Sequence, residues 1–278
     1  MTSTDAWLLV WLAAIAAVVA AMSARGCLRA DAFDPAPPRR VDLTLLDLLI
    51  GALIMFAGVA VLTVLHSRFG PAMDQESDPP STVAWTLASQ GLTQLSVVAF
   101  VLWRTRGGGW RDVGLWPRRP YRELLAGGLA LPAAIVLALG FSAISVSVGR
   151  WFGQPEPDSG HVLLTAMLSA QEVWVVLMLL FSAVVVAPLL EEVIFRGLIQ
   201  TALRSVNQSR NRWLVVIISA ALFALFHGGV PWQVRLSLFV LGIILGWLYE
   251  RYGSLLPSLI VHAGFNAANT ALALAIGE

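Results

Sequence analysis

The chain has 278 residues, of which 58% are hydrophobic and only 13% are charged, and its formal net charge is +1. This composition lies far outside the range of soluble globular proteins, and the small net charge gives no indication of a nucleic-acid partner. The single cysteine, Cys27, excludes an internal disulfide and a metal site built from several cysteines.

Eight apolar segments approach the roughly 20 residues that a membrane-spanning helix needs. They cover residues 6–23, 43–65, 82–103, 123–148, 168–205, 212–227, 232–250 and 254–275. The first lacks the basic region that precedes the apolar part of a signal peptide, so we interpret it as a spanning helix. The sequence therefore predicts an all-α, polytopic membrane bundle of about eight transmembrane helices. We divide it into N-terminal helices and loops (1–121) and a core (122–278).

The fifth segment, residues 168–205, is unusually long and contains Pro188. Because proline removes one main-chain hydrogen bond and crowds the preceding turn, we expect a bend at this position. A second possibility is a span that ends near residue 187 and is followed by an amphipathic re-entrant helix. Hydropathy is compatible with both.

The arginines of the predicted loops indicate the orientation in the membrane. The even-numbered connections hold three of them, and the odd-numbered connections hold fourteen: Arg25, Arg29, Arg39, Arg40, Arg104, Arg106, Arg111, Arg118, Arg119, Arg122, Arg204, Arg210, Arg212 and Arg251. Since loops rich in basic residues stay on the cytoplasmic side, the odd-numbered loops are predicted to be cytoplasmic. We therefore predict a multi-pass protein of the cell membrane with both termini outside the cytoplasm.

Two adjacent glutamates, Glu191 and Glu192, lie in one of the most apolar stretches of the chain. A carboxylate at the centre of a bilayer costs at least about 2.5 kcal/mol on insertion scales. Neighbouring side chains of an α-helix point about 100° apart, so the two carboxylates need different partners. Glu192 and Arg196 are four residues apart with the acid first, which favours an ion pair. This pair would leave Glu191 free to face another helix.

Further polar residues occur at matching depth in the following segments. Glu191 lies 16 residues before Asn207 and His227 lies 15 residues after Arg212, which places both about 23 Å from the connecting turn. His262 and Asn266 lie about 14 and 20 Å from the same side of the membrane. They share a helix face, as do Phe223 and His227. We therefore expect Glu191, His227, His262 and Asn266 to meet inside the membrane.

Two hydrolytic schemes fit these side chains. In the first, Glu191 and His227 activate a water molecule, and His262 and Asn266 donate hydrogen bonds to the oxyanion that forms when the water attacks an amide. In the second, Glu191, His227 and His262 bind a divalent metal such as zinc, with an open fourth position. The cofactor is accordingly either absent or a metal ion.

Three ordered motifs resemble a known family. EEVIFRG at 191–197, FALFH at 223–227 and HAGFN at 262–266 resemble the motifs of the CPBP intramembrane endopeptidases, which include the type II CAAX prenyl protease and bacterial relatives of the abortive-infection and bacteriocin-immunity types. The resemblance covers about residues 122–275. It implies that Glu191 and His227 activate water, that His262 and Asn266 stabilise the oxyanion, and that Glu192, Arg196 and Phe223 support the site.

We expect an intramembrane endopeptidase that cleaves a membrane-bound peptide or protein substrate, which is lipid-modified if prenylated proteins are the targets. The lipid bilayer is a further partner, and nucleic acid is not. Two alternatives use the same residues. A non-catalytic scaffold or immunity protein would keep the polar cluster for helix packing. A proton-coupled transporter would use the buried carboxylates and histidines as a proton path, although the sequence shows no inverted repeat.

Overall fold

The computed structural model describes residues 3–29, 31–33, 43–69, 79–107, 109–111, 113–155, 167, 170, 172–207, 211–228 and 230–276. Within these ranges the chain is helical with connecting turns and contains no strand. The predicted all-α fold is therefore confirmed. Arg39, Arg40 and Arg210, which contributed to the predicted orientation, lie outside the described residues, as do residues 168, 169 and 171 of the fifth predicted segment.

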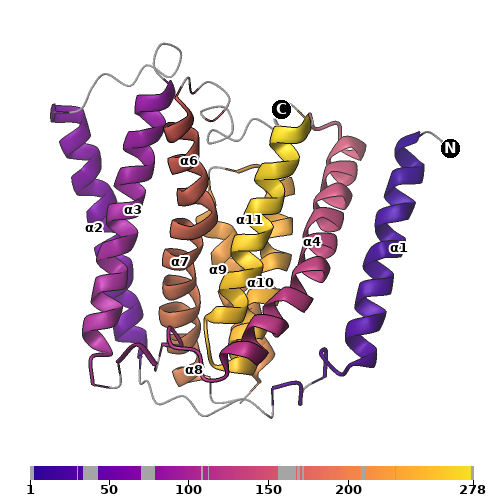
Figure 1. Cartoon of the computed structure of the whole chain (residues 1–278), viewed down its shortest axis with the longest axis horizontal. Coiled ribbons are helices and arrows are strands. Elements are labelled where there is room, and N and C mark those ends of the chain that lie inside the picture. Colours follow the sequence, from indigo (N-terminus) through magenta and orange to yellow (C-terminus); the bar gives the residue numbers. More distant parts are fainter. Residues whose placement is uncertain are drawn as a thin grey trace.

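In the part of the chain that the structure describes, eight helical rods make up the bundle (Figure 1). Six are single helices: α1 (Ser3–Ala24), α2 (Leu45–Phe69), α3 (Pro79–Arg104), α4 (Pro120–Trp151), α10 (Trp232–Tyr252) and α11 (Leu256–Ile276). A seventh, α9 (Arg212–Phe226), has 15 residues, and a short 3-10 turn, η1 (Gly109–Arg111), precedes α4. Seven rods are long and apolar enough to cross a membrane and α9 is shorter, which agrees with about eight predicted helices.

The remaining rod is one continuous helix with two π-helical stretches. It consists of α6 (Val173–Phe181), η2 (Ser182–Val186), α7 (Ala187–Glu192), η3 (Val193–Gln200) and α8 (Thr201–Val206). The residues at the junctions keep right-handed helical dihedral angles, so the helix does not break at Pro188. Of the two predicted possibilities, the structure shows the continuous segment, and its helix begins at Val173 rather than at residue 168.

Two clusters of buried side chains hold the rods together. The first joins α3, η3 and α9 around Phe195, Phe223 and Tyr249. The second joins α4, α10 and α11, with α1 packed against the outer side of α4. Since the clusters share α10, whose Tyr249 lies in the first and whose Leu245 lies in the second, this helix connects the two halves of the bundle.

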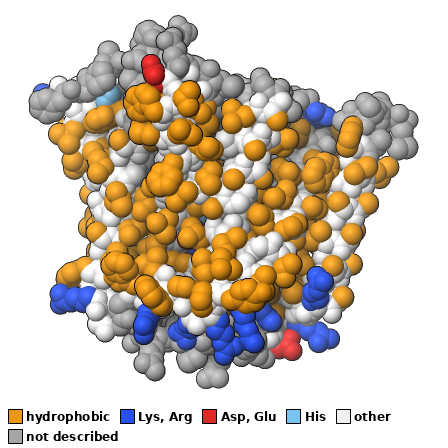
Figure 2. All heavy atoms as spheres, viewed as in Figure 1, with side chains coloured by type: hydrophobic (Ala, Val, Ile, Leu, Met, Phe, Trp, Pro, Cys, Tyr) orange, Lys and Arg blue, Asp and Glu red, His pale blue; other side chains and the backbone are white. Residues whose placement is uncertain are grey.

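Apolar side chains cover the outside of the bundle between two polar ends (Figure 2). Arginines gather at the lower end in this view, which is the end where α9 begins and α10 finishes. The start of α1 and the end of α11 both lie at the opposite end (Figure 1). This surface is typical of a multi-pass membrane protein, because a lipid-facing belt has to be apolar while the ends contact water and head groups.

Local sequence explains several helix boundaries. Pro120 occupies the first turn of α4, where a missing N–H has no partner to lose. The buried Glu123 carboxylate accepts hydrogen bonds from the main-chain N–H groups of Arg118 and Arg119 at 3.0 and 2.8 Å. Gly253 ends α10 with a φ of +63°, which a residue without a side chain adopts at low cost. The chain then turns directly into α11.

Candidate active site

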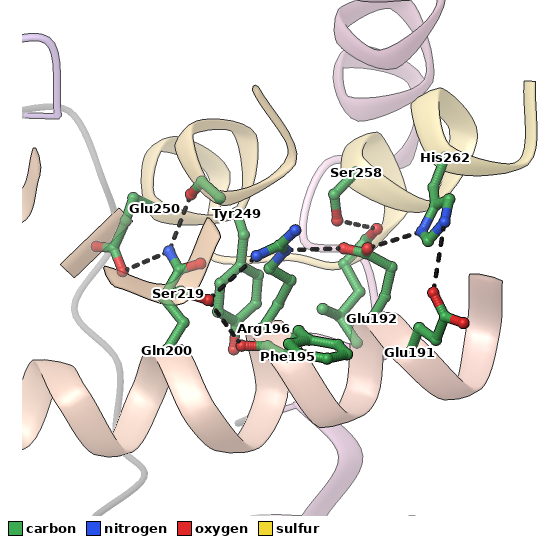
Figure 3. Close-up of polar contacts among 12 residues, drawn as sticks. Glu191, Glu192, Phe195, Arg196, Gln200, Ser219, Tyr249, Glu250, Ser258 and His262 are labelled. Atoms are coloured by element: carbon green, nitrogen blue, oxygen red, sulfur yellow. Dashed lines mark hydrogen bonds and ion pairs between the residues drawn. The ribbon is translucent and has the colours of Figure 1, made fainter. Parts of the chain in front are cut away.

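The short helix α7 ends in Glu191 and Glu192 and lies between the two π-helical stretches. π-helical turns widen a helix locally and often occur at functional sites. Figure 3 shows that both glutamates reach toward α11, where they meet the imidazole of His262 from two sides. Glu191 and Glu192 therefore both contact the imidazole ring of His262, which was not predicted from the sequence.

Glu192 and Arg196 form an ion pair in the interior of the bundle. Their side chains are completely buried, and Oε2 of Glu192 lies 3.4 Å from Nε of Arg196. Arg196 also donates from Nη1 to Oγ of Ser219 at 3.1 Å, and its guanidinium lies over the ring of Phe223, 5.3 Å from the centroid. Charges at such depth are stable only when they are paired, so each residue accounts for the presence of the other.

His262 lies between the two glutamates. Its Nδ1 is 3.0 Å from Oε1 of Glu192, and its Nε2 is 3.7 Å from Oε2 of Glu191. Because Glu192 is paired with Arg196 and its carboxylate can only accept, the proton of the neutral ring resides on Nδ1. The lone pair of Nε2 therefore points toward Glu191.

His227 is the residue at which α9 ends, and it is the second histidine that approaches Glu191. Nδ1 of His227 lies 2.7 Å from the carbonyl oxygen of Phe223, which can only accept a hydrogen bond, so Nδ1 is the donor. Its Nε2 lies 3.9 Å from Oε2 of Glu191. The Phe223 ring contacts both histidines edge-on, with centroid distances of 4.7 Å to His227 and 5.6 Å to His262.

Three acceptor atoms consequently face one another: Oε2 of Glu191 and Nε2 of the two neutral histidines. The distances of 3.7 and 3.9 Å are too long for direct hydrogen bonds. A water molecule, which can donate two hydrogen bonds, is the natural partner for such a group. The side chain of Glu191 is 14% exposed and that of His227 is 28% exposed, so solvent reaches both, whereas Glu192 is fully enclosed.

The same three side chains are the donor set of the predicted metal scheme. Donors bound to zinc at about 2.0–2.2 Å in a tetrahedral site lie roughly 3.4 Å apart, which is closer than Glu191 is to either histidine. Among the described residues, no group of three His, Cys, Asp or Glu side chains is arranged to hold a metal ion. The residues as placed therefore do not fit a metal ion, and the chemistry below uses none.

Asn266 lies one turn beyond His262 on α11 and makes a different contact. Its Nδ2 donates to the carbonyl oxygen of Ala183 in η2 at 2.9 Å. The structure thus brings Glu191, His227 and His262 together directly, while Asn266 is connected to the same helical rod nine residues before Glu192.

Three polar residues of this region escaped the sequence analysis. Ser219 links Arg196 to the main chain of Phe195, and Ser258 points toward the Glu192 carboxylate (Figure 3). Arg235, in the first turn of α10, donates to the carbonyl oxygens of Gly228 and Val230 at 2.7 and 2.9 Å and so holds the turn that follows His227. Serines are common in membrane helices, and the arginine lies outside the three motifs, so these residues carried no recognisable signal in the sequence.

Comparison with known proteins gives two matches. Residues 172–268 match the family model described as type II CAAX prenyl endopeptidase Rce1-like, and this range contains all seven residues predicted for the site. The chain is 33% identical over 82 residues to UPF0177 protein YxdF of Lactococcus lactis subsp. lactis. That alignment covers 30% of this chain and 42% of the relative, so the chain spans less than half of the relative's length. No solved structure matches the chain.

Proposed function

We propose, from the Rce1-like sequence of residues 172–268 and the geometry around Glu191, that this protein is an intramembrane endopeptidase that uses an activated water molecule. The observation that carries the proposal is the convergence of Nε2 of His227 and Nε2 of His262 on Oε2 of Glu191. Three acceptors in a partly exposed position at membrane depth bind and polarise water, and they have no evident purpose in packing alone.

In the proposed reaction, Glu191 removes a proton from the water molecule, which His227 helps to orient. The water oxygen forms a bond to the carbon of the scissile peptide, and the carbonyl electrons move to its oxygen. Nε2 of His262 is an acceptor in the resting site, so it has to take up a proton from solvent before it can donate to this oxyanion, and it returns that proton to solvent after the reaction. Asn266 can donate its second Nδ2 hydrogen to the same oxygen. The carbon–nitrogen bond then breaks as Glu191 returns the proton to the leaving amine.

The substrate we propose is a membrane-bound peptide or protein, because a site below the membrane surface is reached from within the lipid layer. A prenylated C-terminus is one version of such a substrate, in keeping with the description of the matching family. Cleavage of a farnesylated fluorogenic peptide, compared with cleavage of the same peptide without the farnesyl group, distinguishes prenylated from other membrane-bound substrates when both peptides are presented in liposomes.

The central test compares the purified wild-type protein with Glu191→Gln and His227→Ala on a panel of fluorogenic peptides. General-base catalysis contributes about 10²–10⁴-fold, so both variants should lose at least that much turnover while keeping the fold. Glu172→Gln is the matched control, because Glu172 is exposed at the start of α6 and its side chain makes no capping bond. Equal turnover in all four proteins would contradict the proposal and favour a non-catalytic membrane protein.

We also propose that the arginine-rich end of the bundle faces the cytoplasm and that both termini lie outside. The support is the distribution of arginines between the two ends (Figure 2) together with the positive-inside rule. Accessibility of single cysteines placed near Arg106 and near Arg150, in a Cys27→Ser background, tests this orientation. An impermeant thiol reagent applied to intact cells should label the second position only, and labelling of the first alone would reverse the assignment.

A further inference from the structure

The contact between Asn266 and Ala183 has a cause in the main chain of η2. In this stretch the helix is wound so that each N–H donates to the carbonyl five residues back, and the N–H of Ala187 accordingly donates to Ser182. The next donor in this register would be residue 188, and its acceptor would be Ala183. Residue 188 is a proline, which has no N–H.

The carbonyl of Ala183 therefore loses its partner within the helix and receives one from α11 instead. The Nδ2 of Asn266 lies 2.9 Å from this carbonyl oxygen. A carbonyl without a donor inside a membrane bundle is unfavourable, so such groups are almost always satisfied by a neighbouring side chain. Asn266 supplies the hydrogen bond that Pro188 cannot.

The same side of α11 contacts the glutamates. His262, four residues before Asn266, contacts Glu192 at 3.0 Å. α11 is thus fastened to the rod at two levels, by Asn266 before Pro188 and by His262 after it. Glu191 lies between these two attachment levels, and only one of the two Nδ2 hydrogens of Asn266 is needed for the first.

We propose that Asn266 is a positioning residue that replaces the main-chain donor missing at Pro188 and thereby fixes Glu191 relative to His262. This role is additional to the oxyanion role proposed above, and it uses a different hydrogen of the same amide. The effect on Glu191 rests on the proposed function, whereas the link between Asn266 and Pro188 does not.

The test is a double-mutant cycle between two residues, Asn266 and Pro188, whose link runs through one carbonyl. Asn266→Ala in the wild-type background should lower Tm by about 2–4 °C, since a buried carbonyl loses its donor. Pro188→Ala restores an N–H that can serve Ala183, so Asn266→Ala in that background should cost clearly less. Equal losses of Tm in both backgrounds would overturn the inference.

The kcat of proteolysis, measured for the same four proteins of the cycle, gives a second and independent test. If Asn266 only stabilises the oxyanion, its substitution should lower kcat by the same factor with or without Pro188. A positioning role predicts a smaller loss of kcat in the Pro188→Ala background. Should no variant show proteolysis, the Tm cycle still decides the link to Pro188, so failure of the proposed function and failure of this inference are distinguishable.

Pro257→Ala is the control proline, because Pro257 lies in the first turn of α11, where no N–H is needed. It should show no coupling to Asn266→Ala. If Pro188→Ala does not fold, hydrogen exchange replaces the cycle: Asn266→Ala should speed exchange in a peptide covering residues 183–192 and leave a peptide from α10 unchanged. Unchanged exchange at 183–192 would count against the inference.

Discussion

Nδ1 of His262 lies 3.0 Å from Oε1 of Glu192, and this contact gives the second glutamate of the pair a defined purpose. Glu192 fixes the tautomer of His262, so that the other nitrogen of the ring faces Glu191. The two adjacent glutamates therefore have different roles: Glu192 holds the ring of His262, and Glu191 lies on the side of the site that solvent reaches. Arg196 in turn pairs with the second oxygen of Glu192.

Replacing Glu192 by Leu should destabilise the protein strongly, because Arg196 would remain charged and fully buried without its partner. Breaking a buried ion pair on one side costs about 3–5 kcal/mol. The double variant with Arg196→Met should recover most of that loss but not the turnover, since His262 still lacks its acceptor. Unfolding in mixed micelles measures the first effect and peptide cleavage the second. A single variant as stable as the wild type would contradict the role of the pair.

Substituting Arg235 should affect the reaction from a distance. Its two hydrogen bonds, to Gly228 and Val230, hold the turn that begins at His227. Since small displacements of a reacting group are costly, Arg235→Gln should lower kcat about 10-fold or more, and Arg235→Lys should have an intermediate effect. Arg68→Gln, an exposed arginine at the same end of the bundle, should change neither kcat nor KM. Turnover that is unaffected by Arg235→Gln would show that the turn holds its shape unaided.

Two neighbouring glycines of α4 should respond in opposite ways to alanine. A Cβ at Gly127 would lie 2.9 Å from Cβ of Ile260 and from the carbonyl oxygen of Pro257, whereas one at Gly128 would meet nothing within 4 Å. Gly127→Ala should therefore destabilise the contact of α4 with α11 by about 1–3 kcal/mol. Gly128→Ala should be neutral or slightly stabilising. The free energy of unfolding of both variants, measured with denaturant, tests this prediction. Equal effects would mean that α4 and α11 move apart at little cost.

Removal of divalent metal ions should leave proteolysis unchanged. Glu191 and the two histidines are spaced too widely for a tetrahedral zinc site, and the proposed reaction needs only a water molecule at this position. Activity after exhaustive chelation and dialysis, with bound zinc measured per protein, is the appropriate experiment. Loss of turnover that returns stoichiometrically with zinc would replace the metal-free scheme by the metal-dependent one.

Much of this arrangement follows from periodicity and depth. The count of residues from the turn at 207–212 placed Glu191 and His227 at one level, and helical spacing paired Glu192 with Arg196; the structure shows both relationships. The π-helical stretches around α7 did not follow, because they arise from a competition between hydrogen-bond registers that contacts with other helices decide. The partner of Asn266 could not be predicted for the same reason. It is the carbonyl of Ala183, which lacks a donor within the helix only because the π-helical register assigns it to Pro188.

The short α9 has one more consequence, for the lipid around the protein. Its 15 residues rise about 22 Å from the arginine-rich end, against a hydrocarbon thickness of about 30 Å. Gly228 and Pro231 are exposed and non-helical. We expect them to lie within the thickness of the bilayer, where a peptide backbone is tolerated only when water reaches it. We therefore expect the bilayer to be thinner beside His227, and such thinning would give an unwound peptide tail a short route to Glu191 from the end of the bundle opposite the arginines.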